Sequence, residues 1–326
     1  MTELLLEAID LKIHYPVKIR SNRKLLAEKK FVKAVDGVSF QVRRGETFGL
    51  VGESGCGKST TGKAIVKLLR PSAGLLTYEG QDIFKLERQA DREYRRKIQI
   101  IFQDPYSSLD PRFTLERLIG EPMLVSGVSS RGQRRERVLE LMDEVGLRKE
   151  FITRYPHEFS GGQRQRIGVA RALALNPALI VCDEPVSALD VSIQAQILNL
   201  MEELQSKHQL TYFFISHNLS VVKHVCNRIG VMYLGNIVEI ADKSDLFAHP
   251  SHPYTNALLN AVPVPDPEIN SMLEPLQGDV PSPLNPPQGC CFHTRCPQAR
   301  PECSQCKPQL REIEPGHQVA CHLLNN

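Results

Sequence analysis

The sequence has little net charge, no long apolar run and no signal-peptide pattern in its first residues, and each observation argues against a class of function. Its 40 lysines and arginines nearly balance 37 aspartates and glutamates, so the net charge is only +3. That charge implies neither a nucleic-acid partner nor a membrane-binding surface. No apolar run reaches the ~18 residues of a membrane span, and "MTELLLEAIDLKIHYP" has no basic segment followed by an apolar one. We therefore expect a protein made and kept in the cytosol.

Cysteine is scarce over most of the chain. Six of the nine cysteines follow Gly289, and five of these lie within "GCCFHTRCPQARPECSQC". A chain of 326 residues can bury a full core without disulfides, and cytosolic thiols stay reduced. The cluster therefore favours metal ligands or a redox centre. Cys56, Cys182 and Cys226 are interpreted as ordinary small residues.

The hydrophobic pattern divides the chain into stretches. Up to about residue 103 it predicts strands and turns, with an edge sheet leading into a buried strand. Residues from about 104 to 165 are polar and helical, as in "RRERVLELMDEVGL", which predicts an inserted or appended helical subdomain. From Gln163 to His249, helices alternate with apolar strands, so an α/β core with a mostly parallel sheet is expected. The proline-rich sequence after His249 predicts a linker that precedes the cysteine tail.

A glycine-rich loop follows one of the predicted strands. "GESGCGKST" matches the phosphate loop G-x-x-x-x-G-K-[ST] and lies between the strand "TFGLV" and the helix "TGKAIVKLL", which argues against a chance glycine turn. Lys58 is expected on the β- and γ-phosphates of a nucleotide, and Ser59 on magnesium. The glycines let backbone N–H groups wrap the phosphates. The expected contacts are Gly52, Ser54, Gly55, Cys56, Gly57, Lys58, Ser59 and Thr60.

Two adjacent acids end a second apolar strand, "LIVCDE". Asp183 is expected to hold magnesium through water, and Glu184 to polarise the attacking water. Acids are common at strand ends, so this pair is weak evidence by itself. Together with the phosphate loop it predicts a nucleoside triphosphatase.

The stretch "FSGGQRQRIGVARAL" indicates which triphosphatase is expected. Ser160 and Gln163 have the spacing of a capping box, and Gly161 and Gly162 leave the helix N-terminus open to a phosphate. A well-capped helix would explain that pattern by itself. Just upstream of "LIVCDEPVSALD", however, it resembles the signature motif of ATP-binding cassette (ABC) proteins, with Phe159 in place of the commoner leucine.

The resemblance implies a fold and further site residues. The fold is α/β: an ABC-type nucleoside triphosphatase core with an N-terminal antiparallel β subdomain, an inserted helical subdomain and a C-terminal cysteine-rich extension. By the same resemblance, adenine stacks on Tyr15, Gln103 senses magnesium and the γ-phosphate, and His217 is the switch histidine. Asp190 lies on the loop that crosses to a partner. Asn218 stands where many relatives have aspartate, so we expect altered tuning and retained activity.

In ABC proteins, the phosphate loop of one cassette and the signature of another enclose each ATP. This chain carries one of each motif. The resemblance therefore implies that two chains meet head to tail with ATP between them.

The sequence also indicates what the cassette drives. It has no second phosphate loop, no long heptad pattern and no membrane helices, unlike cassettes of translation, DNA repair and most export. "HPYTNALLNAVP" and "PSPLNPPQGC" resemble the C-terminal extension of ATPase subunits of bacterial oligopeptide, dipeptide and nickel importers, and "HYPVK" resembles the F-type subunit. The expected domains are residues 1–250, the nucleotide-binding domain, and 251–326, the extension.

The resemblance then implies a motor subunit for peptide uptake, peripheral to the cytoplasmic face of the inner membrane. Its partners would be a sister ABC ATPase, two membrane permeases and an external solute-binding protein. Nickel or glutathione import, and a soluble ABC ATPase of iron–sulfur assembly, remain alternatives. The importer interpretation predicts a groove near Gln103 to Pro122 for a permease helix.

The clustered cysteines have three interpretations. By resemblance to the tails of peptide-importer ATPases, Cys290, Cys296, Cys303 and Cys321 are expected to bind a four-iron four-sulfur cluster. Zinc is the rival, because Cys303, Cys306, His317 and Cys321 give C-x2-C-x10-H-x3-C. A reduced, metal-free tail is the third. Cys291 and Cys306 are surplus to the cluster.

Overall fold

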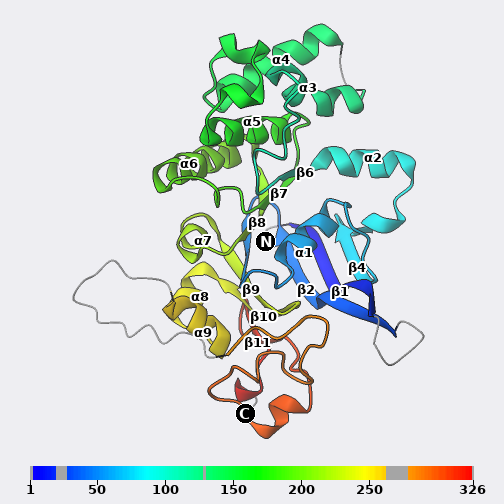
Figure 1. The fold of residues 1–326 in the computed structure, drawn as a ribbon, viewed down its shortest axis with the longest axis vertical. Helices are drawn as coiled ribbons and strands as arrows, with labels where there is room; N and C mark the ends of the chain where they lie inside the picture. Colours follow the sequence, from blue (N-terminus) through cyan, green and yellow to red (C-terminus); the bar gives the residue numbers. More distant parts are fainter. Residues whose placement is uncertain (1–2, 20–27, 128–129, 262–277, 325–326) are drawn as a thin grey trace, which may run out of the picture. The chain divides into compact units, whose positions relative to one another are not determined.

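The computed structural model describes residues 3–19, 28–127, 130–261 and 278–324 (Figure 1). The chain forms two compact units. Unit 1 comprises Met1–Glu3, Arg43–Thr47 and Ile83–Ile215. Unit 2 comprises Leu4–Val42, Phe48–Asp82 and Ser216–Asn326. Each unit is therefore assembled from segments that are far apart in the sequence.

Unit 1 contains a parallel sheet built from apolar strands. Its strands are β6 (Ile98–Ile101), β7 (Leu179–Asp183) and β8 (Thr211–Ser216). β7 lies between the other two and pairs in parallel with both. Every residue of β7 and β8 is buried, as expected for strands that are covered on both faces. The alternation of helices and apolar strands correctly predicted this α/β arrangement.

Helices make up the rest of unit 1. They are η1 (Ile83–Lys85), α2 (Arg88–Lys97), α3 (Leu115–Val125), α4 (Arg131–Glu144), η2 (Lys149–Thr153), η3 (Pro156–Glu158), α5 (Gly161–Leu173) and α6 (Val191–His208). α3, α4 and α5 pack on one another (Figure 1). The prediction of strands and turns up to residue 103 was wrong at α2. Its ten residues bury only Tyr94, so they lack the apolar stripe that would have revealed a helix.

Unit 2 contains a sheet of order β2-β1-β4-β5 and a second group of strands. The first sheet comprises β1 (Leu4–Ile19), β2 (Glu28–Arg43), β4 (Ala73–Tyr78) and β5 (Gln81–Asp82). The second group comprises β3 (Thr47–Val51), β9 (Arg228–Tyr233), β10 (Asn236–Asp242), β12 (His317–Val319) and β11 (Arg311–Glu314). β3 pairs in parallel with β9, and the later pairs β9–β10, β10–β12 and β12–β11 are antiparallel. The C-terminal residues thus extend this sheet.

The helices of unit 2 are short. They are α1 (Lys58–Ile65), α7 (Leu219–Val225), α8 (Lys243–Ala248), α9 (Pro253–Asn260), η4 (Pro301–Ser304) and η5 (His322–Leu324). The expectation of a linker directly after His249 was wrong at α9, where Pro253 occupies the first turn and His252 caps the helix. The proline-rich residues 262–277 lie outside the described residues. Among the helices that the structure describes, none is long and apolar enough to span a bilayer.

Candidate functional site

The phosphate loop connects β3 to α1 and has a backbone that only glycine accommodates. Gly52, Gly55 and Gly57 have φ values of +152°, +79° and +109°. A Cβ on Gly52 would lie 2.0 Å from the Met232 carbonyl oxygen, and one on Gly57 would lie 2.1 Å from that of Ala34. Left-handed φ and these close approaches together exclude side chains. The loop therefore has the glycine-dependent backbone that the sequence motif predicts.

Lys58 begins α1 and turns its side chain back into the loop. It is 4% exposed, and its Nζ donates hydrogen bonds to the carbonyl oxygens of Gly52 at 2.8 Å and Glu53 at 3.0 Å. The ammonium group thus lies against the backbone that would surround phosphates, at the N-terminus of a helix. Ser59 follows in the first turn of α1. Burial raises the pKa of the Cys56 thiol, so Cys56 is a protonated packing residue at neutral pH.

Gln103 and Glu184, two of the predicted catalytic residues, meet in unit 1. Asp183 ends β7 and is 5% exposed. Glu184 follows with φ +47°, a left-handed conformation that is uncommon for residues other than glycine. Gln103 Nε2 donates a hydrogen bond to Glu184 Oε2 at 2.8 Å. The left-handed backbone and this contact lie at the end of β7, where the sequence predicts the general base.

The signature segment folds as its spacing predicts. Ser160 caps α5, its Oγ accepts from the Gln163 amide, and the Gln163 side chain accepts from the Ser160 amide. Ser160 is exposed. A Cβ on Gly162 would lie 2.5 Å from Ile193 Cγ2 of α6. Gly162 therefore also permits the close packing of α5 on α6, which its sequence context did not indicate.

The remaining predicted residues come from separate elements. Tyr15 lies on β1 and is 39% exposed, and Asp190 is an exposed residue at the N-terminus of α6. His217 is exposed between β8 and α7. Asn218 caps α7, because its Oδ1 accepts from the amides of Ser220 and Val221 at 3.0 and 3.4 Å. Sequence reasoning missed this cap, although an asparagine before "LSVVKHV" is a common helix start.

The cysteine tail encloses a cavity in unit 2. The cavity lining includes the four thiols that were expected to bind the cluster, Cys290, Cys296, Cys303 and Cys321, together with Phe292. Burial raises the pKa of the Cys290 thiol to about 11. The structure thus brings these four cysteines around one space.

The rival zinc set is not brought together. His317 Nε2 lies 2.7 Å from Glu239 Oε1 in a fully buried pair, and the Cys306 thiol lies 3.8 Å from His322 Nε2. Among the residues that the structure describes, no group of three or more His, Cys, Asp or Glu side chains is arranged to hold a metal ion. Cys291 accepts a hydrogen bond from Asn236 Nδ2 at 3.2 Å. The iron–sulfur cluster therefore stays a prediction.

The chain is similar to known proteins over almost its full length. The family model "ABC transporter" matches residues 35–187, and "Oligopeptide/dipeptide transporter, C-terminal region" matches residues 238–303. The putative oligopeptide transport ATP-binding protein YkfD of Bacillus subtilis is 54% identical over 99% of this chain and 96% of its own. The dipeptide transport ATP-binding protein DppF of Escherichia coli is 51% identical, over 97% of this chain and 93% of its own.

A solved structure agrees with these relatives. The dimeric, post-hydrolysis structure of the ATP-binding cassette MJ0796 with ADP and Pi covers 73% of this chain and 99% of its own, with 27% identity and a TM-score of 0.63. The fold is that of an ABC ATPase. The phosphate loop, the signature segment and a relative at 54% identity over nearly the whole chain all point the same way. This chain belongs to the ATP-binding subunits of the oligopeptide/dipeptide family of ABC transporters.

Proposed function

We propose that this ATPase is one of two motor subunits of an importer that takes up dipeptides or oligopeptides across the cytoplasmic membrane. The observation that carries the proposal is the similarity to peptide-transport ATP-binding proteins over 99% of the chain, C-terminal region included. In this proposal residues 1–250 form the nucleotide-binding domain, with a helical subdomain over about 104–165. Residues 251–326 form the extension. The subunit is peripheral to the cytoplasmic face of the membrane.

ATP and magnesium fit the residues of the phosphate loop. The loop has glycines where a Cβ would strike backbone oxygens, and a buried lysine ammonium against its carbonyl groups. Lys58 would hold the β- and γ-phosphates, and Ser59, Gln103 and Asp183 would hold magnesium. The ion would neutralise charge that develops on the phosphates.

Glu184 acts as the general base in this proposal and withdraws a proton from the attacking water. Its support is the hydrogen bond from Gln103 Nε2 at 2.8 Å, which holds the Glu184 carboxylate at the end of β7. His217 would contact the γ-phosphate, and Tyr15 would stack on adenine. The exposed Ser160 and Asp190 would face the nucleotide bound to a second cassette.

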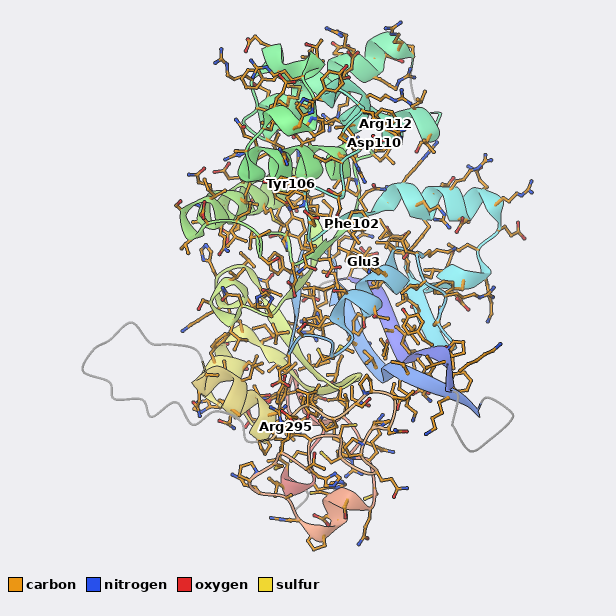
Figure 2. All side chains as sticks on the ribbon, in the orientation of Figure 1. Glu3, Phe102, Tyr106, Asp110, Arg112 and Arg295 are labelled. Carbon is orange, nitrogen blue, oxygen red and sulfur yellow. The ribbon has the colours of Figure 1, made fainter. Side chains whose placement is uncertain are left out.

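A groove in unit 1 suits the permease contact. It is lined by the segment between β6 and α3, which carries the labelled Tyr106, Asp110 and Arg112 (Figure 2), and by residues of α3 and α5. Tyr106 is 59% exposed, and Arg164 lies 4.0 Å over its ring. Asp110 and Arg112 pair at 2.8 Å at the surface. We propose that a cytoplasmic helix of one permease docks here, near the segment Gln103 to Pro122.

The tail would hold a four-iron four-sulfur cluster as a structural cross-link. The support is the cavity lined by the four thiols, since thiolates are the ligands that such clusters take. Cysteines of a cluster bind different irons, so they need not converge on one point as the ligands of a single ion do. Anaerobic purification should yield about four irons per chain. Cys296→Ser should lose them and Cys291→Ser should keep them; one zinc without sulfide would favour the rival.

Reconstituted transport tests the main proposal. The chain, its sister ATPase and two permeases are placed in liposomes with the solute-binding protein outside and ATP inside. Uptake of labelled di- and tetrapeptides should require ATP and be abolished by Lys58→Ala. Uptake of nickel or glutathione, but not of peptides, would show that the proposed solute is wrong. Full ATPase activity in the absence of permeases would favour the soluble iron–sulfur assembly ATPase instead.

A further inference from the structure

The second residue of the phosphate loop is ion-paired to the cysteine tail. Arg295 Nη1 donates to Glu53 Oε2 at 2.9 Å, and Nη2 donates to Glu53 Oε1 at 3.2 Å, so the pair is bidentate. The Arg295 side chain is 5% exposed and that of Glu53 is 26% exposed. Arg295, which Figure 2 labels, thus spans a separation of 242 residues to reach the nucleotide site. Bidentate arginine–carboxylate pairs are among the strongest charge-assisted hydrogen bonds in proteins.

Helix α9, beside the tail, also holds the backbone of Glu53. The Glu53 amide donates to the Tyr254 hydroxyl at 3.0 Å, and Arg295 Nη1 also lies 3.4 Å from the Tyr233 hydroxyl. The rings of Tyr233, Tyr254 and Phe292 contact one another, with centroids 4.7 to 5.4 Å apart. Phe292 in turn lines the thiol cavity. A packed path therefore connects the cavity to the loop.

The negative charge of Glu53 makes its pairing with Arg295 relevant to ATP binding. Glu53 contributes a carboxylate to a loop whose ligand is a triphosphate, and an uncompensated carboxylate there would repel it. The Glu53 carbonyl oxygen also accepts a hydrogen bond from Lys58 Nζ. Displacement of Glu53 would therefore also move an acceptor that positions the Lys58 ammonium group. Burial lowers the pKa of Arg295, but the hydrogen bonds to Glu53 and Tyr233 outweigh burial and raise it. Arg295 is therefore a permanent positive charge at this position.

We propose that Arg295 is a positioning residue for the phosphate loop, which neutralises and holds the Glu53 carboxylate and thereby makes ATP affinity depend on the tail. The proposal rests on ATP binding at this loop, but not on the identity of the transported solute. It assigns the tail a role in nucleotide binding that does not require electron transfer. It also predicts that a change in the tail is felt first as a change in affinity for ATP.

Titration of the full-length chain with a fluorescent ATP analogue tests the proposal. Arg295→Ala should weaken binding about 10-fold, the usual size of coupling between contacting groups. Glu53→Gln should bind within about 2-fold of wild type, because the amide keeps an acceptor for Arg295 and carries no charge. The matched control is Arg300→Ala, which removes a tail arginine that is 52% exposed and lies 3.9 Å from Glu302. This control should leave ATP affinity unchanged.

The double variant separates a charge effect from a merely structural one. If the unpaired carboxylate is what weakens binding, Glu53→Gln should restore affinity in the Arg295→Ala background to within about 3-fold of wild type. The loss in Arg295→Ala should also shrink between 50 and 500 mM salt, because salt screens repulsion between partly exposed charges. A double variant as weak as Arg295→Ala, or wild-type affinity in Arg295→Ala, would overturn the proposal.

Folding and function are kept apart by two further measurements. If Arg295→Ala does not fold, Arg295→Gln replaces it, since this variant keeps one donor and removes the charge. Lys58→Ala reports whether the analogue binds at the phosphate loop at all. In the assembled complex, Arg295→Ala should raise KM for ATP with kcat little changed, and an equal loss in kcat would contradict positioning of the loop. Failure of peptide uptake would leave these binding results untouched.

Discussion

Replacing Glu239 by alanine should release the C-terminal strands from the sheet. Glu239 is fully buried on β10. Its carboxylate accepts from the amides of Ser251 at 2.8 Å and His252 at 3.0 Å, and from His317 Nε2 at 2.7 Å. Each buried donor left without an acceptor costs about 1–3 kcal/mol. Ser251 and His252 lie at the start of α9 and only His317 lies on the tail strands, so about 1–3 kcal/mol of the loss falls on the tail strands.

Hydrogen exchange measures this loss locally. The amide of Ala320 bonds to the Val238 carbonyl beside β12, so its exchange reports the opening of the tail strands. A loss of about 1–3 kcal/mol should accelerate exchange by about 5- to 150-fold. Glu239→Gln, which keeps one acceptor oxygen, should be intermediate, and the exposed Glu314→Ala on β11 should have no effect. Exchange within threefold of wild type in Glu239→Ala would refute the reasoning.

Three further predictions concern unit 1 and assembly. Glu184→Gln should keep ATP binding and slow turnover of the assembled complex by roughly 10²- to 10⁴-fold, and near wild-type turnover would assign the base elsewhere. The isolated chain should hydrolyse ATP slowly and with a rate that rises with protein concentration; a fast, concentration-independent monomer would contradict head-to-tail pairing. Burial raises the pKa of Glu144, but His208, Lys207 and Arg137 outweigh it and lower the pKa. A lowered carboxylate pKa stabilises the fold above the unfolded pKa, and this stabilisation is lost as the pH falls through the folded pKa. Glu144→Gln should therefore cost about 1 kcal/mol at pH 7, and in thermal unfolding the cost should shrink as the pH is lowered below the unfolded pKa.

Local motifs in the sequence predicted most of the nucleotide site. The phosphate loop, the capping box at Ser160 and the acidic end of β7 each depend on residues within a few positions of one another. Their backbone geometry follows from glycine, capping and burial, which act locally. The same holds for the alternation that predicted the α/β core. Helix α2 was not predicted because Tyr94 is its one buried side chain, and one side chain does not produce a helical period of apolar residues.

The sequence by itself determined the family, the motifs and the list of chemical groups available to the site. Only the tertiary structure decided which distant groups meet: Arg295 with Glu53, His317 with Glu239, and the four thiols around one cavity. Such pairs are set by how strands stack and how the tail runs across the sheet, and no periodicity along the chain records them. The zinc spacing shows the limit, since His317, one member of that set, pairs with Glu239. Residues far apart in the sequence come into contact only when the chain packs into its tertiary structure.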